Sequence, residues 1–391
     1  MTARLGFRGF RRPDGRVGVR NHVLVVPTVI CAAVVAERIA QAAPDAAVAL
    51  PHLAGCGQIG PDQHLTHHTL AAYCAHPNVG AVLVIALGCE QVIADRLVSA
   101  ARQAGKPAEL LAIQESGGTL RTIALGQAIV ARLAAEVASA ERTWCDASAL
   151  VLSLKCGGSD YTSGLASNPA LGRVADRLVA LGGSAVLGEI AEIMGAEHLL
   201  AARAPDPAVG GRLLKVIQRV ESEAIALGLD IRGTQPSPGN IRGGLTTIEE
   251  KSLGATHKGG EHTPLVDVVP YAGRITRPGL TVMDTPGLDV ESVTGMVGGG
   301  AQVVVFTTGL GTPTGNPIAP VLKITGNART AARMADNIDL DVSGVIQETE
   351  TLDEAATRLL ASVLDVASGT QVAAERLGHQ EFAIHRTNPT I

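Results

Sequence analysis

Short runs of apolar, β-branched residues alternate with alanine-rich stretches through the first half of the chain. The apolar runs lie at residues 22–29, 46–50, 81–87, 108–113 and 149–154. The stretches between them have helical spacing and lie at residues 32–43, 63–75, 90–104 and 119–138. A strand that is buried on both faces is apolar throughout, whereas a half-exposed strand alternates between apolar and polar residues. The pattern therefore predicts βαβ units, in which helices cover both faces of a parallel sheet.

The second half continues this pattern less evenly. We expect helices at residues 168–180, 208–227, 330–337 and 352–367, and strands at 185–189, 265–269, 280–283, 302–307 and 320–324. We therefore predict an α/β protein with Rossmann-like or flavodoxin-like layers. Its two α/β lobes are expected at residues 1–145 and 146–391. Ligands of open α/β sheets bind outside the carboxyl ends of the strands, so we expect the functional site there.

The composition excludes several classes of function. The net charge is −5 and aromatic residues make up 2% of the chain, which argues against a nucleic-acid-binding surface. No apolar run reaches the roughly 18 residues that a membrane-spanning helix needs. The first dozen residues lack the apolar core of a signal peptide. We therefore expect a cytoplasmic protein whose six cysteines are thiols or metal ligands rather than disulfides.

Four of the six cysteines follow predicted strands. Cys31, Cys56, Cys89 and Cys156 are placed in this way, whereas Cys74 and Cys145 are not. Because the carboxyl ends of parallel strands meet at one edge of a sheet, the first four could converge on a soft metal, an iron–sulfur cluster or a nucleophilic site. The alternative is that each is a small buried apolar residue. We predict a metal site formed by Cys56, Cys89 and Cys156, with Cys31, His52 and Glu90 as further candidate ligands.

An ordered series of glycine-rich motifs carries the strongest signal. It includes Gly55-Cys56-Gly57-Gln58, Leu87-Gly88-Cys89-Glu90, Lys155-Cys156-Gly157-Gly158-Ser159-Asp160, Pro236-Ser237-Pro238-Gly239-Asn240, Glu249-Glu250-Lys251-Ser252-Leu253-Gly254 and Phe306-Thr307-Thr308-Gly309. From about residue 6 to residue 345, this series resembles the altronate/galactarate dehydratase family of sugar-acid hydro-lyases.

Two departures from the family pattern affect what the resemblance implies. Full-length members begin with a small domain of the antifreeze-like (SAF) type, which is missing here, so the chain resembles the large subunit of a split enzyme such as a sulfolactate sulfo-lyase. Family members also carry arginine between two glycines where this chain has Gly309-Leu310-Gly311. Since arginine can bind a carboxylate or sulfonate through two hydrogen bonds, Leu310 predicts a shorter or less hydroxylated substrate.

The resemblance implies a lyase that performs β-elimination on a 2,3-dihydroxy sugar acid. A base removes the proton next to the carboxylate, water leaves from the β carbon, and a 2-keto-3-deoxy acid results. The enediolate that forms needs stabilisation by cations or a metal. The resemblance also implies dependence on iron. We therefore expect an iron–sulfur cluster or a mononuclear Fe²⁺, with another divalent metal as the alternative.

Lysines and glycines of the motifs are the candidate catalytic and binding residues. Lys155 and Lys251 are candidates for the base and its partner, because burial can lower the pKa of a lysine, and His257 lies in a polar loop nearby. Candidates for substrate binding are Arg20, Asn21, Gly157, Gly158, Ser159, Asp160, Asn240, Thr307, Thr308 and Lys323.

Two other functions remain open at this stage. One is a carbon–sulfur lyase that eliminates sulfite from sulfolactate by the same chemistry. The other is a metal-binding module without catalytic activity. The expected partners are a small acidic substrate, a small SAF-domain subunit and further copies of the chain, but neither nucleic acid nor membrane.

Overall fold

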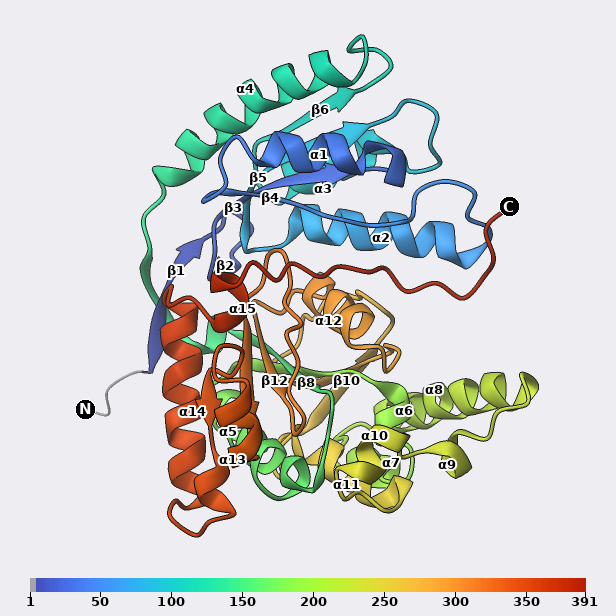
Figure 1. Ribbon diagram of the computed structural model, residues 1–391, viewed down its shortest axis with the longest axis vertical. Coiled ribbons are helices and arrows are strands. Elements are labelled where there is room, and N and C mark those ends of the chain that lie inside the picture. The colour runs from blue at the N-terminus through green and yellow to red at the C-terminus, as the bar shows by residue number, and fades with distance from the viewer. Residues whose placement is uncertain (1–4) are drawn as a thin grey trace.

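The computed structural model describes residues 5–391 and has two α/β lobes, one above the other in Figure 1. Each lobe is built on a sheet of parallel strands. The N-terminal lobe is a four-stranded sheet in the order β4-β3-β5-β6, and all its neighbouring strands are parallel. Its strands are β3 (His22–Pro27), β4 (Ala47–Ala49), β5 (Val79–Ala86) and β6 (Ala108–Ala112). Its helices are η1 (Ile30–Ala32), α1 (Ala33–Ala40), α2 (Pro61–Ala75), α3 (Ala94–Gln103) and α4 (Thr119–Ala138).

Alternating side chains on the strands direct the four main helices to opposite faces of this sheet. Val23 and Val25 of β3 belong to one apolar cluster, which also holds Ile39 of α1 and residues of α4. Leu24 of β3 belongs to the other cluster, which also holds Leu70 of α2 and residues of α3. Because both faces of β3 are covered, its sequence is apolar at every position from residue 23 to 26.

The C-terminal lobe is built on seven parallel strands in the order β10-β11-β9-β8-β12-β13-β14. Their bounds are β8 (Val151–Cys156), β9 (Ser184–Leu187), β10 (Leu265–Val269), β11 (Gly279–Met283), β12 (Val303–Thr307), β13 (Val321–Thr325) and β14 (Leu340–Asp341). The predicted α/β class with parallel sheets is confirmed.

Helices cover both faces of the seven-stranded sheet. Ser153 of β8 contacts Met296 of α12, whereas Thr307 at the end of β12 bonds Asn168 at the start of α5, so α12 and α5 lie on opposite faces. The helices of this lobe are η2 (Ala147–Ala149), η3 (Ser163–Ser167), α5 (Asn168–Ala180), α6 (Ile190–Ile193), α7 (Glu197–Ala201), α8 (Pro207–Ala226), α9 (Ile231–Thr234), α10 (Pro238–Arg242), α11 (Ile248–His257), α12 (Asp289–Gly298), α13 (Ala328–Arg333), η4 (Ser343–Val345), α14 (Leu352–Ala367) and α15 (Ala373–Arg376).

A third, antiparallel sheet lies between the lobes and was not predicted. It has the order β2-β1-β7, formed by β1 (Gly6–Arg11), β2 (Val17–Gly18) and β7 (Thr143–Asp146). Strands as short as β2 and β7 have too few residues to show an apolar period in sequence. The predicted division at residue 145 falls inside β7, and it stays a prediction.

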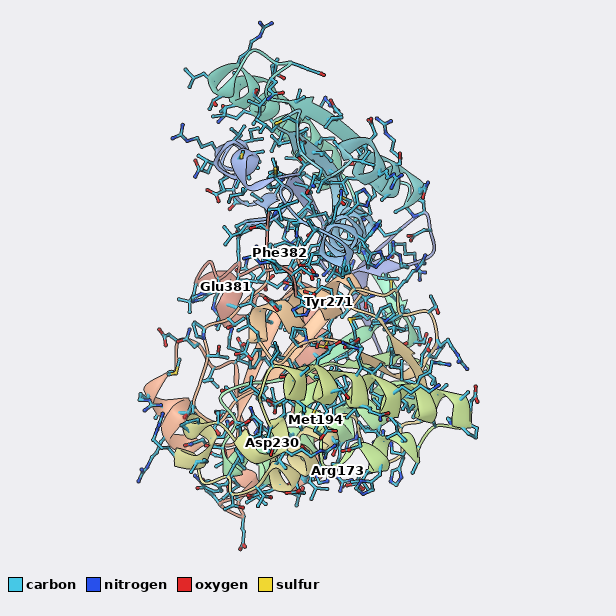
Figure 2. All side chains as sticks on the ribbon, turned by 90° about the vertical axis from the view of Figure 1, so that its right-hand side faces the viewer. Arg173, Met194, Asp230, Tyr271, Glu381 and Phe382 are labelled. Carbon is cyan, nitrogen blue, oxygen red and sulfur yellow. The ribbon has the colours of Figure 1, made fainter. Side chains whose placement is uncertain are left out.

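The segment after α15 crosses from the C-terminal lobe to the N-terminal lobe and follows α2 (Figure 1). Phe382 packs edge-on against Tyr73 of α2, with 4.9 Å between the ring centroids. Further along, the backbone N–H groups of Thr387 and Asn388 donate to the Asp62 carboxylate. Figure 2 shows Phe382 together with Tyr271 at the junction of the two lobes. The last residues therefore tie the lobes together.

No helix within residues 5–391 has the length and apolar character that crossing a bilayer requires.

Candidate active site

A cavity of about 320 Å³ lies at the carboxyl end of the seven-stranded sheet. The loops after β8, β9, β11 and β12 form part of its wall, and the segment from residue 235 to α11 closes it. The chain runs from β8 to β9 on one side and later places β12 on the other side of β8, so β8 lies at a topological switch point. The lining residues are Cys156, Gly157, Gly158, Ser159, Glu189, Ala191, Glu192, Gln235, Ser237, Gly239, Asn240, Lys251, Gly287, Asp289 and Leu310.

Lys155 lies beneath this cavity and is completely buried. Its ammonium group forms ion pairs with Glu189 and with Asp289, the latter at 2.8 Å. It also donates to the Cys156 carbonyl oxygen at 2.7 Å and lies 5.4 Å from the centroid of the Phe306 ring. Three of its contacts are therefore with oxygen atoms, as burial of an ammonium group requires.

A second buried ammonium group, that of Lys258, approaches from the other side of β8. It lies 2.6 Å from the Cys156 sulfur and 3.1 Å from Oε2 of Glu189. Successive side chains of a strand point to opposite faces, so Lys155 and Cys156 extend from opposite faces of the sheet. Glu189 therefore bridges two lysines that reach it from the two faces.

Glu189 adopts a backbone conformation that non-glycine residues rarely adopt. Its φ and ψ are 66° and 64°, in the left-handed region. Such a conformation costs on the order of 1–3 kcal/mol and persists only where its surroundings impose it. Here the Glu189 N–H donates to the Thr285 hydroxyl at 2.7 Å, and the two lysines hold the carboxylate. Strain of this kind is common at functional sites.

The charges of this group are mutually stabilised. Burial alone would raise the pKa of Glu189, but Lys155 and Lys258 lower it below its ordinary value. Burial alone would lower the pKa of Lys155, but Glu189 and Asp289 raise it above the ordinary value. The pKa of Lys258 is raised by Cys156 and Glu189 against the effect of burial. Burial and the Glu189 charge raise the pKa of Cys156 to about 11, although Lys258 opposes this.

A separate polar pair also lines the cavity. The Lys251 ammonium group, on α11, lies 2.9 Å from Oε1 of Glu192 and donates to Oε1 of Gln235 at 2.8 Å. The other carboxylate oxygen of Glu192 is buried and has no hydrogen-bond partner among the described residues. Two buried ammonium groups thus lie beneath the cavity, and its wall has a carboxylate that is half satisfied.

Comparison with protein families gives a match over both lobes. Residues 147–390 match the model described as D-galactarate/Altronate dehydratase, C-terminal, and residues 9–138 match D-galactarate dehydratase/Altronate hydrolase, second domain. This chain belongs to the altronate/galactarate dehydratase family. The family predicted from the motifs is therefore confirmed.

Individual relatives agree with this family. The chain is 40% identical to the (2R)-sulfolactate sulfo-lyase subunit beta of Chromohalobacter salexigens over 97% of each chain. It is 36% identical to the altronate dehydratase of Bacillus subtilis, and 33% identical to the galactarate dehydratase (L-threo-forming) of Escherichia coli. The last two matches cover 98% of this chain but 78% and 77% of the relatives. The chain is an enzyme of the lyase class, either a hydro-lyase or a sulfo-lyase.

Several site residues predicted from sequence lie in or next to this dehydratase-family cavity. Gly157, Gly158, Ser159, Asn240 and Lys251 line it, and Lys155 lies below it. The expectation that burial would lower the pKa of Lys155 and make it a base is not met, because two carboxylates raise that pKa. Lys155 suits the stabilisation of negative charge instead.

Other predicted residues have structural contacts outside the cavity. Asp160 is buried and accepts from the Asn327 amide at 2.8 Å, and the Thr308 hydroxyl accepts from the Gly311 N–H at 2.9 Å. His257 is exposed at the end of α11, whereas its neighbour Lys258 reaches the site. Four more predicted residues do not line the cavity. Thr307 bonds Asn168, and Lys323 is buried in β13. Arg20 pairs with Glu375, and Asn21 bonds the Val137 carbonyl oxygen.

The predicted three-cysteine metal site is not formed. Cys56 and Cys89 are exposed in loops of the N-terminal lobe, whereas Cys156 is buried in the other sheet. The prediction assumed that all these strands end at one sheet edge, but they belong to two sheets. Within residues 5–391, no three His, Cys, Asp or Glu residues are close enough to bind a metal ion together.

The further candidate ligands also have other contacts. His52 bonds the Pro27 carbonyl oxygen through Nε2 at 2.7 Å, and Glu90 accepts from the Gly88 N–H at 2.7 Å. Cys31 is exposed within η1 in the N-terminal lobe. The described residues therefore offer no assembled site for iron.

Four residues of the site were missed in the sequence. They lie outside the glycine-rich motifs and are Lys258, Glu189, Glu192 and Asp289. The three acidic residues follow strands. The available signal was their position, since acidic residues directly after buried strands face the ligand edge of such a sheet. Lys258 lies between His257 and Gly259-Gly260, in a stretch that the sequence predicts only to be a polar loop.

We expect Glu189→Gln to reduce the free energy of unfolding by about 3–5 kcal/mol, because it leaves two buried ammonium groups without their carboxylate. Denaturant titration at pH 7 measures this loss. The pKa of Glu189 is depressed in the folded protein, so its contribution is present above its unfolded pKa, near 4, and is lost as the pH falls further.

The matched control is Glu223→Gln, which breaks an exposed ion pair with Arg219 and should cost at most about 1 kcal/mol. Equal losses for the two variants would contradict the role given to Glu189.

Proposed function

We propose that this chain is the larger subunit of a two-subunit lyase that eliminates sulfite from a short 2-hydroxy-3-sulfo acid such as sulfolactate. The supporting observation is the match in length and sequence to the sulfo-lyase subunit, which covers 97% of both chains. Leu310 gives further support, since it lines the cavity and offers no hydrogen bond to a long polyhydroxy acid.

The cavity supplies the groups that this reaction needs. Lys155 and Lys258 carry positive charge below the cavity floor, where an enediolate or a carboxylate is stabilised by a field that is already in place. Gly158 leaves the backbone accessible at the cavity because it has no side chain, whereas the Gly157 N–H already donates to the Thr307 carbonyl oxygen. The anionic end of the substrate is therefore expected to face the loop after β8.

The elimination balances without an oxidant. A base takes the proton from C2, the C2–H electron pair forms the C2=C3 double bond, and the electrons of the C3–S bond leave with sulfite. The enol that remains becomes a 2-keto acid. We propose that Asp289 is the base that accepts the C2 proton. Its carboxylate lines the cavity and is about one-third exposed, whereas Lys155 is held as an ammonium ion.

A second candidate is dehydration of a sugar acid. It is favoured by the 36% and 33% identity to altronate and galactarate dehydratases. The bond changes are the same, except that hydroxide leaves from C3 in place of sulfite and the product is a 2-keto-3-deoxy acid.

Four expectations from the sequence belong to this proposal. They are a small SAF-domain partner subunit, an oligomer of the large subunit, dependence on iron, and location in the cytoplasm. The partner is supported by the similarity to a protein named as a subunit beta, and a reducing compartment is supported by six free cysteines. Iron rests on the family resemblance alone.

Release of sulfite and of 2-keto acid from sulfolactate, altronate and galactarate tests the proposal. The assay is run anaerobically, with and without Fe²⁺, and with and without the proposed small subunit. We expect sulfite and keto acid from sulfolactate in equal amounts, in the presence of the partner. Keto acid from altronate or galactarate without sulfite release from sulfolactate would replace the proposal by the second candidate.

Asp289→Asn should lower kcat by at least about 100-fold while KM changes little, because general-base catalysis contributes roughly 10²–10⁴-fold. Steady-state kinetics on the best substrate of the panel measures this. A kcat within threefold of the parent enzyme would remove Asp289 as the base.

Leu310→Arg should shift specificity toward longer, hydroxylated acids. The added guanidinium group can donate a hydrogen bond to a polar group of the substrate, which Leu310 leaves unpaired. Such a contact changes kcat/KM by about tenfold to hundredfold. The ratio of kcat/KM for altronate to that for sulfolactate is the measurement. An unchanged ratio would show that residue 310 does not contact the substrate.

A further inference from the structure

One carboxylate oxygen on the cavity wall lacks a partner. Glu192 follows β9 on the short helix α6, and its side chain is mostly buried. Oε1 is bound by the Lys251 ammonium group, whereas Oε2 is shielded from solvent and accepts no hydrogen bond from the described residues. Leaving a buried acceptor unsatisfied is unfavourable, and more so for a charged group.

Neighbouring groups hold this carboxylate in place and do not satisfy it. Lys251 is itself fixed by Gln235, which also lines the cavity. The two ammonium groups nearer the cavity floor are bound by Glu189, and Lys155 also by Asp289. Glu192 lines the same cavity as Cys156 and Glu189, so its carboxylate shares this space with the groups above the two buried lysines.

The chemistry of the oxygen restricts what can satisfy it. A free carboxylate oxygen accepts hydrogen bonds and repels anions, so it does not bind the carboxylate or the sulfonate of a substrate. A hydroxyl group is the donor that a 2-hydroxy acid offers. Placing that hydroxyl at Glu192 leaves the anionic groups to the side of the cavity with Lys155, Lys258 and the glycines.

We propose that Glu192 determines specificity by accepting a hydrogen bond from the 2-hydroxyl group of the substrate. This inference rests on the function proposed above and adds the group that distinguishes 2-hydroxy acids from their 2-deoxy analogues. Glu192 positions the substrate through this contact, and Lys251 positions Glu192. A site that hydrogen-bonds a substrate hydroxyl rejects analogues without it, because its own polar group is then left unpaired.

The test compares sulfolactate with 3-sulfopropionate, which lacks the 2-hydroxyl. Initial rates give kcat/KM for sulfolactate and the inhibition constant of 3-sulfopropionate. For Glu192→Ala we expect kcat/KM to fall by about tenfold to hundredfold, since a hydrogen bond to a charged group is lost. The inhibition constant of 3-sulfopropionate should stay within about threefold. Glu192→Gln, which keeps one oxygen acceptor, should recover part of the loss.

The matched control is Glu197→Gln on the neighbouring α7, where the carboxylate pairs with Arg232 outside the cavity. It should change neither constant by more than about threefold. A structural role of Glu192 would weaken both ligands together, and that result would overturn the inference, as would an unchanged kcat/KM in both Glu192 variants.

Failure of the proposed function gives a different result. If the parent enzyme with its partner acts on altronate and not on sulfolactate, the same comparison is made with altronate and its 2-deoxy analogue. Selective loss for the hydroxylated acid would then support the role of Glu192 on the other substrate. If the parent enzyme neither binds nor converts any of the three acids, the proposed function and the inference both fall.

Discussion

The ion-pair bridge through Glu189 is the constraint on which the rest of the site depends. One carboxylate joins Lys155, which extends from one face of β8, to Lys258, which follows α11 on the other side. Moving three charged groups out of water costs several kcal/mol each unless their mutual contacts offset it. The contacts of its carboxylate with both lysines accompany the left-handed backbone conformation of Glu189.

This bridge also determines what the cavity can do. Two lysines with one shared carboxylate leave one positive charge beneath the loop after β8, and the Asp289 carboxylate pairs with it. These groups are held in place before substrate arrives, so little reorganisation is needed when negative charge develops on the substrate. Glu192 and Lys251, which line the same cavity, add a hydrogen-bond acceptor of defined position. The cavity therefore combines buried ammonium groups beneath it with a free acceptor oxygen on its wall.

Much of the fold and part of the site could be predicted from the sequence. The apolar strands of both lobes and the family were predicted correctly, and Gly157, Gly158 and Lys251 line one cavity with Lys155 below it, although their roles stay predictions. The grouping of the cysteines failed, because sequence order does not say that β4 and β5 belong to a different sheet from β8. Glu189 and Lys258 were missed because a single charged residue outside a recurring pattern has no period and no motif.

The sequence by itself determined the parallel α/β class and the lyase family, since local apolar runs and ordered motifs depend on residues close together in the chain. Only the tertiary structure decided which charges meet. Lys258 lies 102 residues after Cys156, yet its ammonium group touches that sulfur. The tertiary structure likewise places Glu192 beside Lys251 and leaves Oε2 of Glu192 without a hydrogen-bond partner among the described residues. Contacts of this kind follow from the order of strands in a sheet and from the packing of helices on its two faces, because the interaction between two charges depends on their separation in space.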